Sequence, residues 1–292
     1  MSYHSINGQF QAASDQAALG LRDRGLAYGH GLFETLCYQR GELPLKERHV
    51  QRLCTDALAL GISLNPTQIS VYLDSFLDGL SAVSVNQGVV KLIVTAGAGG
   101  RGYQCPPSLS PLVICQYSEF DAAEARAQRQ QGIKLWRCKY RLPLNPALAG
   151  IKHLNRLDQV LARREWSSTE YADGLMLSVD GLVIEATAAN LFARIDRGWI
   201  TPALDTAGVA GVMRALLQEE LFTAAALPLR VEPLSLSHLE QASEIFLCNS
   251  VRGIVPVTQI AGAGSAPEVN KLIGEQTKML QSRLSQQYSC YL

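Results

Sequence analysis

A lysine and a glutamate in the second half of the chain are residues whose types could do chemistry together. Lys152 lies in NPALAGIKHLNRL, between a stretch marked by proline and glycine and a run with apolar residues at helical spacing. Glu185 lies in VIEATAANLF among small and apolar residues, where an unpaired carboxylate would be costly. A lysine amine can condense with an aldehyde, and a buried carboxylate can hold a proton on a cationic ring nitrogen.

A third feature, the segment AGVAGVMR, predicts a helix that opens with glycines. The first turn of a helix presents unpaired N–H groups and a partial positive charge, so the amides of Gly211, Val212 and Met213 could bind a phosphate. Together the three features suit a phosphorylated aromatic cofactor. Each also has a simpler interpretation: a solvated lysine, an exposed turn carboxylate, and an ordinary turn before a helix.

The first half of the chain predicts a compact unit of strands and helices, residues 1–120. HSINGQF and GLFETLCYQRGELPL are typical of hairpins, with turns at Asn-Gly and Arg-Gly. Helical spacing of apolar residues predicts one helix from residue 46 to a glycine C-cap at Gly61, and a second over 65–80. Two apolar runs, GVVKLIVTAG and PLVICQYSEF, predict buried strands that flank the loop GAGGRGYQCPPSLS.

The second half predicts a larger α+β domain, residues 132–292. Before it, the polar, alanine-rich segment 121–131 predicts an interdomain linker, with a short helix as the alternative. A strand over IKLWRCKY should precede the lysine segment, and the helix that follows should bury Leu154, Leu157, Val160 and Leu161. Short strands with Asp-Gly and Arg-Gly turns, a glycine-led helix, a strand pair in ASEIFLCNSVRGIVPV and a helix from about Pro267 complete a two-domain α+β fold.

The composition excludes several classes of function. Lys plus Arg and Asp plus Glu each number 26, so the chain lacks the positive charge that nonspecific nucleic-acid binding needs. It shows neither a signal peptide nor an apolar run of about 20 residues, so we expect a cytoplasmic protein without a membrane span. Seven cysteines without a C-x-x-C pair indicate reduced thiols, and the five histidines lack metal-ligand spacing. We therefore expect no metal.

Taken together, these segments resemble the fold-type IV pyridoxal-phosphate enzymes, which include branched-chain and D-amino-acid aminotransferases and aminodeoxychorismate lyases. The segments occur in the same order as in the family and span nearly the whole chain: GAGGRGY, NPALAGIKHLNRL, EATAANLF, GVAGVMR and LCNS. The similarity is greatest to the lyases. Each segment alone is weak evidence, whereas the combination is specific.

The resemblance implies that Lys152 carries pyridoxal 5'-phosphate, that Glu185 pairs with the pyridine nitrogen, and that Arg52 in RHVQRL binds the phosphate. An arginine suits this role because its planar fork makes directed, charge-assisted hydrogen bonds. Where relatives have a serine-rich run after the glutamate, this chain keeps one hydroxyl. The remaining cofactor contacts that the resemblance implies are Gly211, Val212, Met213, Thr187 and Ser250.

The expected substrate brings two carboxylates, which its pocket must meet with cationic or amide donors. The loop GAGGRGYQC offers four glycines, which let the backbone approach a ligand, and the guanidinium of Arg101. The segment AYGHGLFET matches a pocket-lining segment of the family, although His30 stands where many relatives have aspartate. The substrate-binding residues that we expect are Arg101, Tyr103, Asn249, Tyr28 and His30.

The reaction implied is the elimination that converts 4-amino-4-deoxychorismate to 4-aminobenzoate and pyruvate, a step of folate biosynthesis. An aminotransferase acting on branched-chain or D-amino acids is the alternative, and a homologue without catalysis is a third interpretation. We expect the cofactor in the cleft between the domains, because Arg52 comes from the first and Lys152 and Glu185 from the second. Members of this fold are homodimers, so a homodimer is also expected.

Overall fold

The chain divides into two compact units, and one of them takes in a short segment from later in the sequence. The computed structural model describes residues 3–12, 19–100, 102–106, 108–261 and 268–292. Unit 1 comprises Met1–Asp121 and Lys152–Asn155, and unit 2 comprises Ala122–Ile151 and Arg156–Leu292. The segment expected as a linker forms helix α4, Ala122–Gln131, within unit 2, and Lys152 lies in unit 1.

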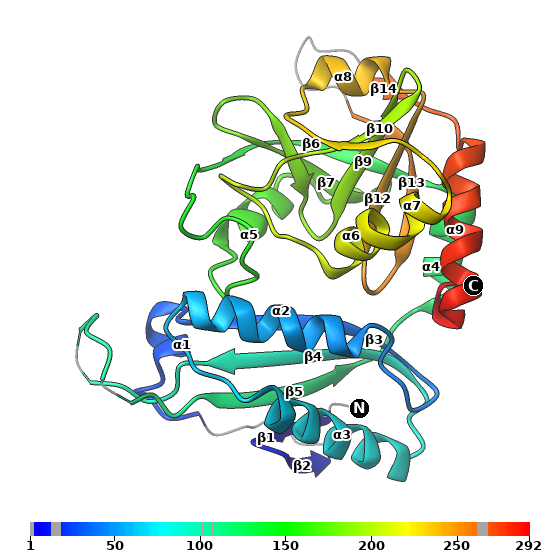
Figure 1. Cartoon of the computed structure of the whole chain (residues 1–292). Coiled ribbons are helices and arrows are strands. Elements are labelled where there is room, and N and C mark those ends of the chain that lie inside the picture. Colours follow the sequence, from blue (N-terminus) through cyan, green and yellow to red (C-terminus); the bar gives the residue numbers. More distant parts are fainter. Residues whose placement is uncertain (1–2, 13–18, 101, 107, 262–267) are drawn as a thin grey trace. The chain divides into compact units, whose positions relative to one another are not determined.

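Unit 1 is built on an antiparallel sheet with the strand order β2-β1-β5-β4-β3 (Figure 1). Helix α2 lies along β3, and α3 lies against β1, β2 and β5 (Figure 1). The strands are β1 Tyr3–Ile6, β2 Gln9–Ala12, β3 Gly31–Gln39, β4 Gln87–Thr95 and β5 Leu112–Ser118. The helices are α1 Arg24–Tyr28, α2 Lys46–Ala59 and α3 Pro66–Ala82.

Local sequence signals account for much of unit 1. The first hairpin is confirmed: Asn7 and Gly8 join β1 to β2 with positive φ values of 47° and 82°, as a tight turn with the correct twist requires. Helix α3 begins after Asn65, whose side chain accepts from two backbone amides, and Pro66 occupies its first turn. In β4, alternate side chains are fully buried beneath the helices: Val90, Leu92 and Val94.

The second predicted hairpin is wrong beyond its turn. Arg40 and Gly41 do turn the chain with positive φ, but the returning arm makes a single bridge, between Gln39 and Glu42. β3 pairs instead with β4 along its whole length. The returning residues include Leu43 and Leu45, which are buried and lead directly into α2. Burial of these leucines thus competes with a local strand pair.

Unit 2 is built on a mixed sheet with the path β11-β10-β9-β12-β13-β6-β7-β8, and β14 also pairs with β13. The strands are β6 Ile133–Leu142, β7 Tyr171–Ser178, β8 Val183–Ala186, β9 Asn190–Ile195, β10 Gly198–Thr201, β11 Leu229–Val231, β12 Glu244–Asn249, β13 Gly253–Ile260 and β14 Val269–Asn270. The α-helices besides α4 are α5 Leu157–Arg163, α6 Val212–Leu216, α7 Phe222–Ala224, α8 Leu236–Gln241 and α9 Glu275–Gln287. A π-helical turn, Leu217–Leu221, joins α6 to α7, and a 3₁₀ turn, Ser289–Tyr291, follows α9.

The strands of unit 2 carry the expected turn chemistry. Gly181, with φ 80°, lies in the turn between β7 and β8, and Asp196, with φ 54°, lies between β9 and β10. The predicted series of short strands is therefore confirmed. Helices α4 and α9 pack against β13 (Figure 1). The core of the sheet consists of apolar side chains of β6, β7, β9, β12 and β13, such as Leu135, Leu175, Leu191, Leu247 and Val255.

Two predictions about helices in unit 2 need correction. The helix after the lysine segment is short, and Leu157, Val160 and Leu161 are exposed on it, so the predicted buried face is wrong; Ala162 is its buried residue. The C-terminal helix begins at Glu275, after the short strand β14, rather than at about Pro267, a residue outside the described part of the chain. Within the described residues, none of the helices has the length and apolar character needed to cross a bilayer.

Candidate active site

Lys152 is fixed by its backbone to the open edge of β3. Its carbonyl accepts from the amide of Phe33 at 3.1 Å. Two residues later, the amide of Leu154 donates to the carbonyl of Gly31 at 2.9 Å. The amide of Lys152 donates to Oδ2 of Asp56 on α2 at 3.2 Å. The side-chain nitrogen lies over the Phe33 ring, 4.3 Å from its centre. A short strand extension, rather than the helix that follows, therefore positions the lysine.

A buried ion cluster joins β3 to α2 in the same unit. Glu34 is 1% exposed; Nε of Arg52 donates to its Oε1 at 2.9 Å, and the Arg52 Nη2 donates to its Oε2. Nδ1 of His49 lies 2.6 Å from the same Oε2. Residues 49 and 52 are three apart on α2, so both side chains reach the strand from one helical face. Glu34 thus fixes the position of the arginine that we predicted to bind phosphate.

The cluster determines the charge of its members. Burial alone would raise the pKa of Glu34, but Arg52 and His49 outweigh that effect and lower it to about 2. Burial lowers the pKa of His49, and the bond to Glu34 opposes this only in part. Because Glu34 is ionised, Nδ1 of His49 must carry the proton. Nε2 of His49 is buried and has no hydrogen-bond partner among the described residues, so it is an open hydrogen-bonding position.

In unit 2, Glu185 lies within β8 and is 4% exposed, so its predicted burial is correct. Its Oε2 accepts from the Val209 amide at 2.9 Å and lies 3.4 Å from Nδ2 of Asn190. Burial lowers the pKa of Arg156 and of Arg214, and the Glu185 charge raises both in part. The Glu185 carboxylate is oriented by the donors of Val209 and Asn190, and its charge is felt by nearby guanidinium groups. It is suited to accept a hydrogen bond from a protonated ring nitrogen.

The segment that leads into α6 is packed too closely for larger residues. Gly211 is the N-cap of α6, and a Cβ at this position would overlap Oδ1 of Asn190. Gly208, with φ 87°, turns the chain so that Val209 can donate to Glu185. Val212 and Met213 open the helix, with their amides in its first turn. The glycines at 208 and 211 therefore adapt this segment to Glu185 and Asn190.

Three further predicted residues have partners within unit 2. The Thr187 hydroxyl donates to Asp173 at 2.5 Å, and Asp173 also pairs with Arg252 at 2.9 Å. The side chain of Asn249 donates to the Ala188 carbonyl at 3.0 Å and accepts from two amides of the turn after β12. Ser250 is buried. In this arrangement the single hydroxyl hydrogen of Thr187 is directed to a carboxylate rather than to any other acceptor.

The predicted substrate residues of unit 1 gather at α1 and the loop between β4 and β5. The rings of Tyr28 and Tyr103 are 5.4 Å apart. His30 bonds through Nε2 to the Leu60 carbonyl at 2.9 Å, and its Nδ1 accepts from Arg24 at 3.1 Å. Arg101 lies outside the described residues.

Sequence reasoning missed four residues of these two clusters. Glu34 and His49 lie on consecutive elements and meet only when α2 packs on β3, whereas Asp56 meets the Lys152 segment from 96 residues away. Asn190 meets Glu185 only once β8 and β9 have turned back on each other. The available signal was an acidic residue in the apolar run GLFETLCY, which is costly without a cationic partner.

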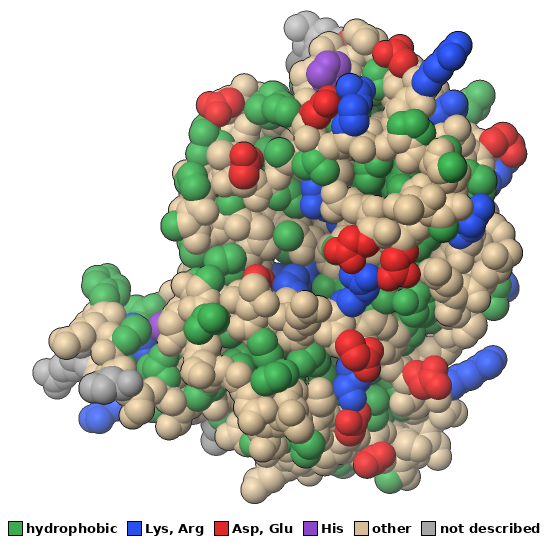
Figure 2. Space-filling view, viewed as in Figure 1, with side chains coloured by type: hydrophobic (Ala, Val, Ile, Leu, Met, Phe, Trp, Pro, Cys, Tyr) green, Lys and Arg blue, Asp and Glu red, His purple; other side chains and the backbone are tan. Residues whose placement is uncertain are grey.

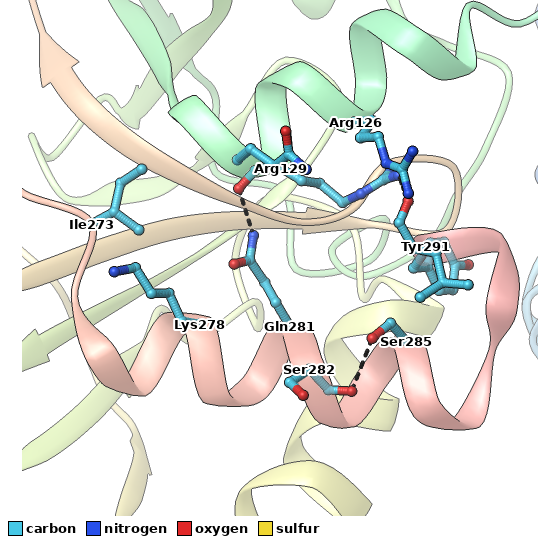
Figure 3. Close-up of a pocket in the computed structure, with 10 residues that line it drawn as sticks. Arg126, Arg129, Ile273, Lys278, Gln281, Ser282, Ser285 and Tyr291 are labelled. Carbon is cyan, nitrogen blue, oxygen red and sulfur yellow. Dashed lines mark hydrogen bonds between the residues drawn. The ribbon is translucent and has the colours of Figure 1, made fainter.

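A separate pocket of about 330 Å³ lies in unit 2 between α4 and α9 (Figure 3). Arg126 and Arg129 line it from α4, and Lys278 and Gln281 line it from α9, where Gln281 donates to the Arg129 carbonyl at 2.9 Å (Figure 3). None of the predicted site residues lines this pocket. No group of three or more potential metal ligands occurs in the part of the chain that the structure describes.

Comparison with known proteins agrees with the resemblance found in the sequence. The family model of class IV aminotransferases matches residues 31–260. An aminodeoxychorismate lyase of Vibrio harveyi is 37% identical over 275 residues, which cover 92% of this chain and 97% of that protein. A putative branched-chain-amino-acid aminotransferase of Methanocaldococcus jannaschii is 28% identical, with 95% and 93% covered.

The structural comparison gives the same result. The crystal structure of 4-amino-4-deoxychorismate lyase from Pseudomonas aeruginosa superimposes with a TM-score of 0.87 at 41% identity, and the match covers 98% of this chain and 99% of that one. The mixed helix and sheet architecture is therefore that of the fold-type IV pyridoxal-phosphate enzymes. The fold class expected from the sequence is confirmed, and the chain belongs to the class IV aminotransferase family.

Proposed function

We propose that this chain is a pyridoxal-phosphate-dependent lyase that converts 4-amino-4-deoxychorismate to 4-aminobenzoate and pyruvate. The observation that carries the proposal is the 41% identity to a lyase of that name, over 98% of the chain and with a TM-score of 0.87. The product is the aromatic amine of folate, so the reaction belongs to folate biosynthesis.

The residues present fit pyridoxal phosphate. The Lys152 amine is held at the edge of β3, Arg52 is oriented by Glu34, and the open Nε2 of His49 belongs to the same cluster. In unit 2, Glu185 is a buried carboxylate suited to a pyridinium nitrogen. We assign Lys152 to the aldehyde, Glu185 to the ring nitrogen and Arg52 to the phosphate. The further phosphate contacts in this proposal are Gly211, Val212, Met213 and Ser250, together with Thr187, whose hydroxyl would have to turn away from Asp173 to reach the phosphate.

Bound pyridoxal phosphate supplies an electron sink for negative charge at the carbon that bears the substrate's nitrogen. The Lys152 amine removes the proton from that carbon, and its ammonium form then gives a proton to the departing enolpyruvyl group. Glu185 holds the proton on the pyridine nitrogen, which maintains the sink. Breaking the C–O bond to the enolpyruvyl group makes the ring aromatic, and the released enol becomes pyruvate, so the equation balances without a further reactant.

An aminotransferase that acts on branched-chain or D-amino acids is the second candidate, because the aminotransferase relative from Methanocaldococcus jannaschii also spans nearly the whole chain. Lys152 and Glu185 would have the same partners in that reaction. The two functions differ in one requirement. A transaminase needs a keto acid to accept nitrogen, whereas the lyase needs only its substrate.

The test is product analysis with the purified protein carrying its cofactor, supplied with aminodeoxychorismate and no keto acid. We expect equal amounts of 4-aminobenzoate and pyruvate, and loss of at least about 10³-fold in rate for Lys152→Ala, which removes both the cofactor link and the proton carrier. Borohydride reduction and peptide mapping should place the pyridoxyl group on Lys152. Product that forms only when a keto acid is added would refute the lyase assignment.

We further propose a cytoplasmic homodimer whose partner chain helps to close the substrate pocket. Among the most exposed large apolar side chains are Leu21, Leu26 and Tyr103, at 90%, 60% and 85%, all in or near α1 and the loop after β4. Hydrophobic side chains gather at this projecting end of unit 1 (Figure 2). Exposed apolar groups of this kind mark interaction surfaces. The cytoplasmic part of the proposal is supported by the seven cysteines, which are thiols, as in reducing compartments. Full activity from a species that light scattering shows to be monomeric would refute the dimer.

A further inference from the structure

The loop between β4 and β5 is attached to the start of α1 by backbone hydrogen bonds. Arg24 donates its amide to the Gly97 carbonyl at 2.9 Å, and the amide of Gly99 donates to the Arg22 carbonyl at 3.1 Å. A bridge between Asp23 and Ala98 lies between these two bonds. Among the described residues, Gly99 is the last of the loop to take part in this pairing with the start of α1.

The side chain of Arg24 binds carbonyls of loop residues beyond Gly99. Nη1 donates to the carbonyls of Gly102 and Gln104, each at 3.4 Å, and Nη2 donates to the carbonyl of Tyr103 at 3.1 Å. Three consecutive loop carbonyls therefore converge on the guanidinium of Arg24, a residue that is 4% exposed. Carbonyl oxygens presented to a buried cation form charge-assisted hydrogen bonds, and only the planar fork of arginine can reach several of them at once.

Other contacts orient the guanidinium itself. Nε donates to Nδ1 of His30 at 3.1 Å, and the ring of Tyr28 lies 5.1 Å from its central carbon. A Cβ at Gly99 would lie 2.7 Å from Cδ of Arg24, so this position leaves room only for glycine. His30 must present its Nδ1 lone pair to Arg24, which leaves Nε2 to donate to the Leu60 carbonyl.

We propose that Arg24 is a positioning residue that holds Gly102, Tyr103 and Gln104 in the conformation that serves recognition of the substrate's carboxylates. The proposal rests on the proposed function for the identity of the substrate, but the attachment of the loop does not depend on it. Arg24 is assigned no contact with substrate or cofactor. It acts through the loop residues whose carbonyls it binds, Tyr103 among them.

The test uses Arg24→Gln, which removes the fork and the charge, and Arg24→Lys, which keeps the charge alone. Arg22→Ala is the matched control, because Arg22 is exposed and contributes to the loop through its carbonyl, which the substitution retains. The full-length protein with its cofactor is measured by amide hydrogen exchange over 97–106, by its cofactor absorption spectrum, and by kcat and KM for aminodeoxychorismate.

For Arg24→Gln we expect exchange in the loop to rise by roughly 10- to 100-fold, as loss of charged hydrogen bonds implies. KM should rise by a similar factor, with kcat changed less and the spectrum unchanged. Arg24→Lys should restore little of the slow exchange and low KM of the parent protein. Arg22→Ala should have the exchange rates and KM of the parent protein. Wild-type exchange and KM in Arg24→Gln, or full recovery by lysine, would overturn the proposal.

Gly99→Ala tests the same attachment with Arg24 still present, which keeps the proposal open to refutation if Arg24→Gln fails to fold. Its added methyl group displaces the Arg24 side chain, so faster exchange in the loop is expected again. Unchanged exchange in a folded Gly99→Ala protein would count against the attachment. If the parent protein does not convert aminodeoxychorismate but Arg24→Gln still loosens the loop, the proposed function fails and the positioning role of Arg24 stands.

Discussion

The two units each bury a carboxylate, and the hydrogen-bond donors that it meets differ between them. Glu34 in unit 1 is bonded to the guanidinium of Arg52 and the ring of His49, and its pKa falls to about 2. Glu185 in unit 2 accepts from the backbone amide of Val209 and lies beside the carboxamide of Asn190. The first carboxylate orients cationic groups of α2. The second accepts from neutral donors and also acts on the charges of Arg156 and Arg214, and we propose that it pairs with a cationic ligand. Burial of a carboxylate alone therefore does not reveal its role.

Among the variants that test this difference between the two carboxylates, Glu34→Gln should cause the largest loss of stability. The amide would leave Arg52 and His49 buried without their anion, and breaking a buried pair in this way costs about 3 to 5 kcal/mol. Urea unfolding should show the loss, and cofactor affinity should fall with it because Arg52 is no longer held. The control is Glu47→Gln on the exposed face of α2, which should change stability by less than about 0.5 kcal/mol. Equal stability of the two variants would remove the cluster from the framework of unit 1.

The loss of folding stability at acidic pH should also depend on the ionisation of Glu34. Its folded pKa of about 2 lies below the ordinary 4.5, so its contribution is complete above pH 4.5 and is lost as the pH falls toward 2. The shift corresponds to about 3 kcal/mol. His49 acts in the same direction, because burial lowers its pKa below 6.5 and acid must therefore force a proton onto it. Below pH 4.5, where Glu34 itself titrates, unfolding free energies should fall less steeply with pH in Glu34→Gln than in the parent protein.

Glu185→Gln should affect turnover strongly and stability little, the reverse of what we expect for Glu34→Gln. The amide oxygen can still accept from Val209, so stability should change by about 1 kcal/mol or less. The neutral amide cannot hold the pyridinium proton, so turnover should fall by roughly 10²-fold while the cofactor is retained. Stopped-flow rates and the cofactor spectrum separate the two effects. Wild-type turnover in this variant would remove Glu185 from the mechanism.

Gly211→Ala should lower the stability by less than Glu34→Gln does. The new Cβ would overlap Oδ1 of Asn190 and push it from its bonds to Glu185 and to the Val209 carbonyl. Overpacking of this kind costs about 1 to 3 kcal/mol. Thermal unfolding should report the loss, and Gly181→Asn, in an open turn with positive φ, is the control because asparagine tolerates that conformation. An unchanged melting temperature would show that Asn190 can move without cost.

Local signals in the sequence predicted much of the fold. The Asn-Gly turn, the N-cap of α3 and the alternation in β4 each act within a few residues, so they were visible in advance. The segment order identified the family and pointed to Lys152, Glu185 and Arg52. The roles of these residues stay predictions, as do the domain boundaries.

The remainder depends on contacts between elements, which form only when the chain packs. The pairing of β3 with β4 displaced the expected hairpin, and Glu34 meets His49 only when β3 packs on α2. The apolar pattern after Lys152 indicated a buried helical face, yet those leucines are exposed. A single-sequence pattern reports the period of a segment but not the surface that covers it.

The segment Lys152–Asn155, which completes unit 1 from the middle of the later sequence, has a consequence for biosynthesis. Residues 1–121 can leave the ribosome with their sheet formed, but the edge of β3 stays open until residue 155 has also emerged. A nascent chain arrested before that point presents unpaired edge groups at Gly31 and Phe33, which can pair with another chain. The lysine segment is therefore also what closes this edge, and truncated chains that end before it should be the aggregation-prone species during synthesis.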